Sequence, residues 1–328
     1  MSLPRFNAVP HLGAVFAGTA AHICYAGRPM TAPTSPLHAA AGIICLGSLW
    51  GLMMSLAKLA TSAGVPPVSY SLWQSTGAGA LLLALAAWRG LSLGYGWEHL
   101  RFYLAMGIFS IALPNANMAF CVKHIPAGLM SLLVNLSPVV TYAIAVVIRL
   151  EAFSMPRALG ILVGLGGVVV LVSPGVALPS PDLLPWLLQA ILTPVLYATG
   201  NVIGVKLRPT DRNAPILMAA GMLGGAISFL LPAAGALDQL YVPWPPLLPG
   251  EWALIAVMFV SVCSYILYFD LLRRVGAVFV SQASYAVALS GLFWGWLFFG
   301  ETVGLGVIVS ASLIFAGLYL VNRRPPAA

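Results

Sequence analysis

The chain has 328 residues, of which 15 are Lys or Arg and 8 are Asp or Glu, while 60% are hydrophobic and the mean hydropathy is +0.97. An ordinary soluble domain has about 25% charged residues, so a chain with 7% could not cover a soluble surface. Disorder is excluded as well, because disordered chains combine low hydrophobicity with high charge. The composition indicates a polytopic membrane protein.

Apolar runs bounded by proline, glycine or charge divide the chain into segments suited to membrane helices, each of which needs about 20 apolar residues. These segments cover residues 38–61, 67–88, 101–121, 126–149, 155–173, 184–206, 213–232, 251–271, 276–299 and 303–321. No loop between them is long enough for a second folded domain. We therefore predict an all-α polytopic membrane protein with ten transmembrane helices.

The basic residues support one orientation of this map. With the N-terminus in the cytoplasm, only Lys123 falls in an outer loop, and Lys58 lies within the first span. The other 13 of the 15 basic residues lie inside: Arg5, Arg28, Arg89, Arg101, Arg149, Arg157, Lys206, Arg208, Arg212, Arg273, Arg274, Arg323 and Arg324. The positive-inside rule therefore predicts a multi-pass protein of the cytoplasmic membrane with both termini in the cytoplasm.

Residues 1–37 do not fit a span. The apolar segment 11–27 is short and contains two histidines, so we predict a mobile N-terminal tail without a function of its own. A mis-assigned start is one explanation, since a chain beginning at Met30 would start just ahead of the first helix. A secretory signal is the alternative.

The sequence also contains an internal repeat. A shift of 150 positions aligns residues 125–153 with 275–303 without a gap, and the identities include Glu151 with Glu301. The two repeats, 38–173 and 184–322, each hold five predicted spans, so the second must enter the membrane upside down. Two inverted five-helix repeats are typical of secondary transporters, whose substrate site lies near the membrane midplane.

Four stretches carry a resemblance to a known family. They are LWGLMMSLAK (49–58), IPAGLMSLLVNLSPV (125–139), RLEAFSMPRALGILVGLGGVVVLV (149–172) and YILYFDLLRRVGA (265–277). Their order and duplication resemble the EamA-like carriers of the drug/metabolite transporter superfamily, over residues 38–322. The resemblance implies a ten-helix inner-membrane protein, commonly an exporter of amino acids or other small metabolites. It also implies a central cavity lined mainly by helices 1, 3, 4, 6, 8 and 9. The sequence departs from the family pattern at Tyr197, where a tryptophan is common.

Polar and aromatic side chains within the spans are the candidates for a substrate site, because polar groups in a bilayer usually face the bundle interior. Helical spacing places Asn135 and Tyr142 on one face of the fourth span, and Pro114 interrupts the third span beside Asn115. The predicted cavity-lining residues are Trp50, Asn115, Asn135, Tyr142, Tyr197, Asn201, Tyr265, Tyr268 and Tyr285. The alternative role for such side chains is hydrogen bonding or packing between helices.

Two ionisable residues are candidates for gating or coupling. Lys58 lies toward the outer end of its span, from which its side chain could also reach the headgroups. Asp270 has the spacing for a local ion pair with Arg273 or Arg274. Glu151 and Glu301 each precede a helix, and we expect each carboxylate to stabilise the N-terminus of the helix that follows it.

The sequence contains no HExxH, GxSxG or P-loop motif, and its five histidines and four cysteines are dispersed. We therefore expect no enzyme activity, no cofactor and no metal site. The expected function is export of small metabolites such as amino acids by alternating access. The expected partners are a small-molecule substrate and the lipid bilayer, with no nucleic acid, and a homodimer is left open. Multidrug or cationic-compound efflux is the first alternative; an intramembrane enzyme or a non-transporting membrane protein is the second.

Overall fold

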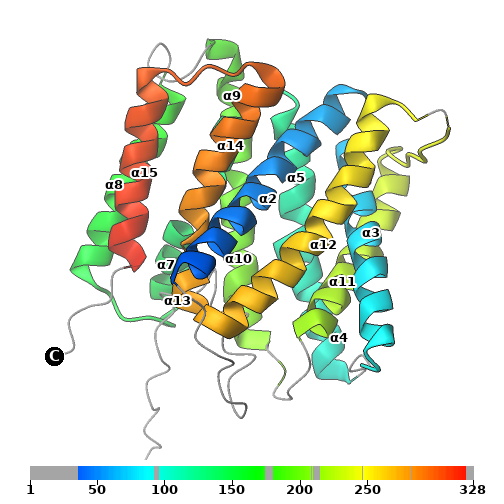
Figure 1. Cartoon of the computed structure of the whole chain (residues 1–328). Helices are drawn as coiled ribbons and strands as arrows, with labels where there is room; N and C mark the ends of the chain where they lie inside the picture. The colour runs from blue at the N-terminus through cyan, green and yellow to red at the C-terminus, as the bar shows by residue number, and fades with distance from the viewer. Residues whose placement is uncertain are drawn as a thin grey trace, which may run out of the picture.

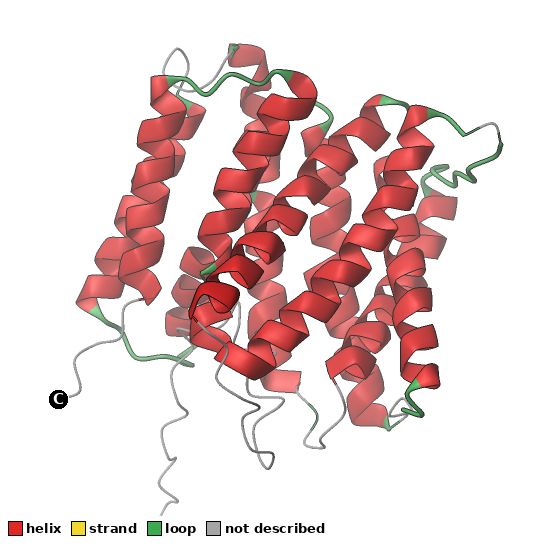
Figure 2. Cartoon of the chain, in the orientation of Figure 1, coloured by secondary structure: helices red, strands yellow, loops and turns green. Residues whose placement is uncertain are grey.

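The computed structural model describes residues 36–91, 96–173, 180–207, 209, 215–245, 247–280 and 282–322, and every regular element within them is helical (Figure 2). The elements are α2 (Pro36–Ser62), α3 (Pro67–Trp88), α4 (Trp97–Met106), the π-helix η1 (Gly107–Ala112), α5 (Leu113–Val122), α6 (Ala127–Val134), α7 (Ser137–Val147), α8 (Met155–Val172), the 3₁₀ turn η2 (Pro181–Leu183), α9 (Leu184–Ala190), α10 (Leu192–Leu207), α11 (Pro215–Ala236), α12 (Pro249–Val275), α13 (Ala277–Val280), α14 (Ala283–Phe299) and α15 (Leu305–Asn322). The predicted tail 1–37 lies outside the described residues except for its last two, which begin α2.

Eight helical runs in the described residues are long and apolar enough to cross a membrane. They are Leu37–Ser62, Trp97–Val122, Ala127–Val147, Met155–Val172, Leu184–Leu207, Pro215–Ala236, Pro249–Leu272 and Leu305–Asn322. Large apolar side chains such as Leu162, Val169 and Ile308 are exposed on these helices, as expected for surfaces that face lipid. The chain is therefore a multi-pass membrane protein. The remaining two predicted spans fall on α3, with 22 residues, and on the short apolar α14, with 17.

The helices form a bundle whose two ends can be named by residues at them (Figure 1). At the lower end in Figure 1 α2 begins, α8 begins and α15 ends, and this end is termed the Arg157 end after the buried arginine of α8. The opposite end, where α14 is joined to α15, is termed the Glu301 end. Helix α2 crosses the bundle in contact with both α12 and α14, while α3 packs against α11 and α12.

Prolines interrupt two of the helical runs that line the middle of the bundle. A proline has no amide hydrogen, so Pro138 cannot donate to the carbonyl of Val134, the residue at which α6 ends. Pro114, just after the π-helix η1, likewise cannot donate to the carbonyl of Ser110. Inside a membrane, such irregular backbone is tolerated where it is buried in protein or lines a wet cavity. The breaks therefore indicate where in the bundle a polar site can form.

A loop at the Glu301 end joins α3 to α12 through hydrogen bonds. The amide of Val68 donates to Gln239 Oε1 at 3.1 Å, and the indole of Trp73 donates to the carbonyl of Tyr241 at 2.7 Å. The hydroxyl of Tyr241 donates to Glu251 Oε1 at 2.8 Å, in the first turn of α12. This hydrogen bond is the main reason that the pKa of Tyr241 is raised. The loop therefore holds the ends of α3 and α12 together.

Glycines allow α8 and α15 to pack with their backbones in contact. A Cβ added at Gly317 would lie 2.6 Å from the amide nitrogen of Gly164 and 2.7 Å from the carbonyl oxygen of Gly160. Beside this contact, the hydroxyl of Ser310 donates to the carbonyl of Gly167 at 2.7 Å. Small residues at a helix interface let apolar helices associate by close packing in a lipid environment, where the hydrophobic effect gives no driving force.

We predict that Gly317→Ala destabilises the protein by about 1–3 kcal/mol, because the new methyl group overlaps backbone atoms that cannot move independently. The matched control is Gly166→Ala on α8, where an added Cβ has no neighbour within 4 Å. Thermal unfolding in detergent measures both. Equal unfolding temperatures for the two variants would contradict the close backbone contact.

Candidate functional site

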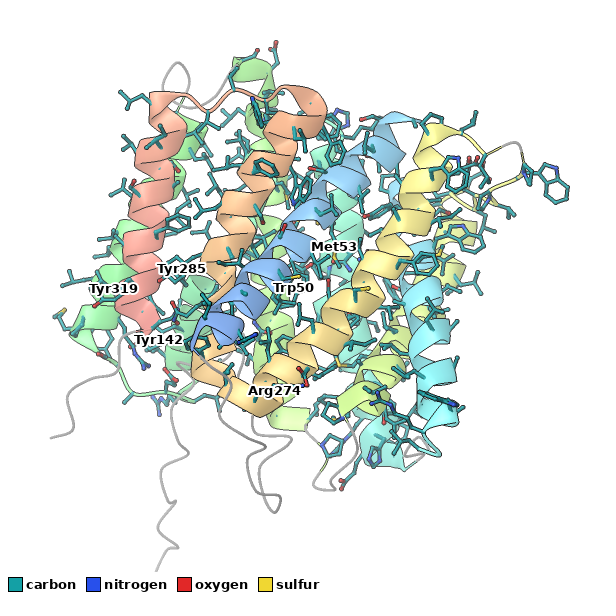
Figure 3. All side chains as sticks on the ribbon, in the orientation of Figure 1. Trp50, Met53, Tyr142, Arg274, Tyr285 and Tyr319 are labelled. Atoms are coloured by element: carbon teal, nitrogen blue, oxygen red, sulfur yellow. The ribbon has the colours of Figure 1, made fainter. Side chains whose placement is uncertain are left out.

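A cavity of about 200 Å³ lies near the middle of the bundle. Its lining residues come from seven helical runs: Trp50, Met53, Met54, Gln74, Ser110, Ile111, Asn115, Met118, Val134, Asn135, Tyr197, Ser261, Ser264, Tyr265, Ser284 and Val287. The side chains of Trp50 and Met53 point from α2 toward the centre of the bundle in Figure 3. Ten of these residues precede residue 174 and six follow residue 183, so both halves of the chain build the wall.

The proline breaks lie in this wall. Ser110 and Val134, to whose carbonyls Pro114 and Pro138 cannot donate, both line the cavity. Asn135 follows the end of α6 and also lines it, with its Nδ2 donating to the carbonyl of Ser131 at 2.7 Å. Local sequence thus explains why polar groups gather at this depth.

The polar side chains of the wall are partly paired with each other. The hydroxyl of Tyr197 donates to Asn115 Oδ1 at 2.6 Å, which joins α10 to α5. Gln74 Nε2 donates to Ser261 Oγ at 3.1 Å, which joins α3 to α12. Gln74 is only 7% exposed, and its Oε1 has no hydrogen-bond partner. The wall therefore contains one buried acceptor that has no hydrogen-bond partner.

None of the lining residues carries a charged side chain. The wall offers the carboxamides of Gln74, Asn115 and Asn135, the hydroxyls of four serines and two tyrosines, the indole of Trp50 and the thioethers of three methionines. Within the described residues, no three His, Cys, Asp or Glu side chains gather at a place where they could hold a metal ion. The arrangement can bind by aromatic contact and by hydrogen bonds.

Five of the nine predicted cavity residues line the cavity: Trp50, Asn115, Asn135, Tyr197 and Tyr265. Tyr268 is not among the lining residues but packs behind them, with its ring 5.7 Å from that of Trp50. Asn201 also lies outside the lining set, and its Nδ2 donates to Thr141 Oγ1 at 3.4 Å.

Tyr142 and Tyr285 lie away from the cavity. The hydroxyl of Tyr142 accepts from the amide of Ser154 at 2.9 Å, and its ring lies 5.2 Å from the guanidinium carbon of Arg157. Figure 3 shows Tyr142 toward the Arg157 end, well below Trp50. Tyr285 packs edge-on against Phe315 of α15, with ring centroids 5.4 Å apart.

The ionisable candidates also lie outside the cavity wall. Asp270 forms an ion pair with Arg274, with Oδ2 2.7 Å from Nε. Lys58 forms an ion pair with Glu301, with Nζ 2.6 Å from Oε1. Glu301 accepts hydrogen bonds from the amides of Ala127 and Gly128. The expectation for this carboxylate is therefore corrected, since it binds the N-terminus of α6 as well as Lys58, and α15 begins only at Leu305.

Sequence reasoning missed the serines of the wall. Ser261, Ser264 and Tyr265 have the i, i+3, i+4 spacing of one helical face, so the tyrosine already chosen could have led to both serines. Ser110 lies four residues before Pro114, and the lost backbone hydrogen bond was the signal for it. Ser284 has no comparable sequence signal.

These features define a multi-pass membrane protein of the transporter type, with a central uncharged cavity. The family model described as the EamA-like transporter family matches residues 38–173 and again residues 184–323. The chain therefore belongs to the EamA-like transporter family, and the family model matches each half of the chain once.

Curated relatives are transporters by name. The chain is 24% identical over 285 residues to the uncharacterized transporter YoaV of Bacillus subtilis (strain 168). This alignment covers 85% of this chain and 94% of the relative. It is 22% identical to the uncharacterized transporter YvbV of the same organism, over 85% of this chain and 90% of the relative. A solved crystal structure with 18% sequence identity shares the fold, with a TM-score of 0.58 over 89% of this chain and 98% of the other.

The hydrogen bond between Tyr197 and Asn115 gives a testable prediction. Tyr197→Phe should destabilise the protein by about 0.6–1.7 kcal/mol, the range measured for polar contacts between membrane helices. In an Asn115→Ala background the same substitution should have a smaller effect, because the acceptor is already gone. Thermal unfolding of the four proteins in detergent gives the coupling energy, and a value of zero would contradict the contact.

Proposed function

We propose that the protein is a secondary carrier that exports a small uncharged or zwitterionic metabolite, such as an amino acid, across the cytoplasmic membrane by alternating access. The observation that carries this proposal is the uncharged cavity, which lies near the middle of the helices and is built by both family-matched segments. Sites of secondary transporters form where two repeats meet near the membrane midplane, often at interrupted helices.

The ten-helix, two-repeat architecture is part of the proposal. The family match on each half supports it, as do helices that begin 150 residues apart: α6 at Ala127 with α13 at Ala277, and α8 at Met155 with α15 at Leu305. The fourth and ninth predicted spans are both interrupted, between α6 and α7 and between α13 and α14. With α3 and α14 counted as spans, each half has five helices and the second half is inverted. The distribution of basic residues then favours cytoplasmic termini.

The chemistry of the wall favours a substrate that both donates and accepts hydrogen bonds. The buried Oε1 of Gln74 has no partner and can accept from an ammonium or amide N–H group. The hydroxyl of Ser284 and the indole of Trp50 can donate to a carboxylate or carbonyl. An unpaired buried acceptor costs about 1–3 kcal/mol, so a substrate that fills it gains affinity by removing this cost.

Efflux of varied drugs is the alternative function that one observation favours. Met53, Met54 and Met118 line the cavity, and flexible methionines suit surfaces that adapt to several ligands. A binding site for cationic compounds would be expected to hold a carboxylate, however, and the nearest candidate from the sequence, Asp270, is paired with Arg274. The balance of charge therefore favours metabolites.

Flux in proteoliposomes tests the proposal. Purified protein should transport one or more neutral or zwitterionic amino acids in a panel that also contains uncharged metabolites and cationic dyes. Absence of flux for every solute by a folded protein would refute the carrier function, and flux restricted to cationic dyes would favour drug efflux.

Two asparagines provide a matched pair for the site. Asn135→Ala should lower flux about tenfold or more, because it removes a carboxamide of the wall that meets the substrate. Asn201→Ala, on an apolar helix but outside the wall, should change flux by less than about twofold at equal expression. The reverse ranking would show that the substrate binds elsewhere.

A further inference from the structure

A buried carboxylate at the Glu301 end joins the two halves of the chain. Glu301 Oε1 lies 2.6 Å from Lys58 Nζ and accepts from the amide of Ala127 at 2.7 Å, while Oε2 accepts from the amide of Gly128 at 3.0 Å. Its side chain is 13% exposed. The carboxylate thus connects the loop between α14 and α15 to α2 and to the first residues of α6.

These contacts favour a closed arrangement at this end. Hydrogen bonds from charged or backbone donors to a carboxylate are about twice as strong as those between neutral groups, and a helix N-terminus attracts negative charge. The Lys58 ammonium also lies 4.7 Å from the centre of the Phe299 ring, at the end of α14. One turn further along α6, Ser131 Oγ donates to the carbonyl of Gly128 at 2.7 Å and lies 3.3 Å from the carbonyl oxygen of Ala288, so α6 and α14 also pack closely beyond the carboxylate.

The 150-residue repeat identifies an equivalent set of groups at the Arg157 end. Glu151 corresponds to Glu301, and the amides of Ala277 and Val278 at the start of α13 correspond to those of Ala127 and Gly128 at the start of α6. In this structure Glu151 is bound differently. Its Oε2 lies 2.7 Å from Nη1 of Arg157, whereas its Oε1 is buried and has no hydrogen-bond partner.

The two carboxylates therefore differ in how well they are satisfied. Both oxygens of Glu301 have partners, but one oxygen of Glu151 and the Nε of Arg157 have none. A half-satisfied buried ion pair is costly, because the desolvation of its charges is not fully compensated. A second conformation in which Glu151 binds two further N–H groups would remove that cost.

We propose that Glu301 and Glu151 are alternating gate residues, each of which closes one end of the cavity by binding the N-terminus of a helix in the opposite half. In the conformation described here, Glu301 closes the outer end by holding α6. In the opposite conformation, Glu301 releases α6, and Glu151 binds the amides of Ala277 and Val278 to close the cytoplasmic end. This inference rests on the alternating-access function proposed above.

Labelling of a single cysteine from each side of the membrane tests the gates. In a background in which Cys24, Cys45, Cys121 and Cys263 are replaced, Ser264→Cys places a thiol in the cavity wall. A membrane-impermeant maleimide is applied to intact cells and to inverted vesicles. Glu301→Gln should raise the labelling rate from outside about tenfold, because loss of charge weakens three hydrogen bonds of the closed outer end. Glu151→Gln should lower it, because the outward-open state loses its stabilising contact.

A second variant perturbs the outer gate without changing charge. A Cβ at Gly295 would overlap Oε2 of Glu301, so Gly295→Ala should also raise labelling from outside. Gly166→Ala, where an added Cβ has open space, is the control and should leave the rate unchanged. Gly295→Ala also carries the test if Glu301→Gln fails to fold, as judged by size-exclusion profile and thermal unfolding.

The outcomes separate this inference from the proposed function. Opposite shifts for the two glutamine variants support alternating gates. Shifts in the same direction, reversed shifts, or no effect of Gly295→Ala would overturn them. The labelling rates need no transported solute, so gates that fail while wild-type flux persists refute this inference alone. Wild-type protein without flux for any solute would instead refute the carrier function.

Discussion

The structure depends on the requirement that backbone amides and carbonyls buried in an apolar bundle have partners. Continuous helices meet it for most of the chain, and prolines break it at a few positions. Pro114 and Pro138 cannot donate to the carbonyl four residues before each of them, and both carbonyls belong to residues of the cavity wall. The same requirement applies at the start of α6, where the amides of Ala127 and Gly128 need an acceptor from outside their own helix. Glu301 meets it from the other half of the chain.

This requirement explains how much of the fold could be predicted from sequence. Hydropathy and punctuation by proline and glycine located the helical segments, because those signals come from local chain chemistry. The interruptions of α6–α7 and α9–α10 were not resolved, since a hydropathy window averages over a break of two residues. The partner of Glu301 could not be predicted either. The helix that follows Glu301 in the sequence is α15, and sequence reasoning naturally assigns the carboxylate to it. Helix α6 is distant in the sequence and lies beside Glu301 only because α14 packs on α6.

The candidate site illustrates the same limit at the level of single residues. Tyr142 was placed with Asn135 by assuming one continuous helix with a period of 3.6 residues. The break between Val134 and Ser137 changes the helical register, and Tyr142 instead meets Arg157 and the amide of Ser154. Asn115 also lies on an interrupted segment, but it directly follows Pro114, so the accumulated error in its direction is small. Tyr285 shows a different limit, because helical spacing gives a face but not the neighbour, which here is Phe315.

The hydrogen-bonded loop that joins α3 to α12 has a consequence for how the cavity changes shape. Val68 and Trp73 on α3 are bound to the loop, and the loop is bound to Glu251 on α12. Gln74, the next residue of α3 after Trp73, bonds to Ser261 and so joins the same two helices again. These contacts hold α3 and α12 together, so we expect the two helices to move as a unit when the cavity changes shape. The part of the wall that they form would then keep its geometry for a molecule arriving from either side of the membrane.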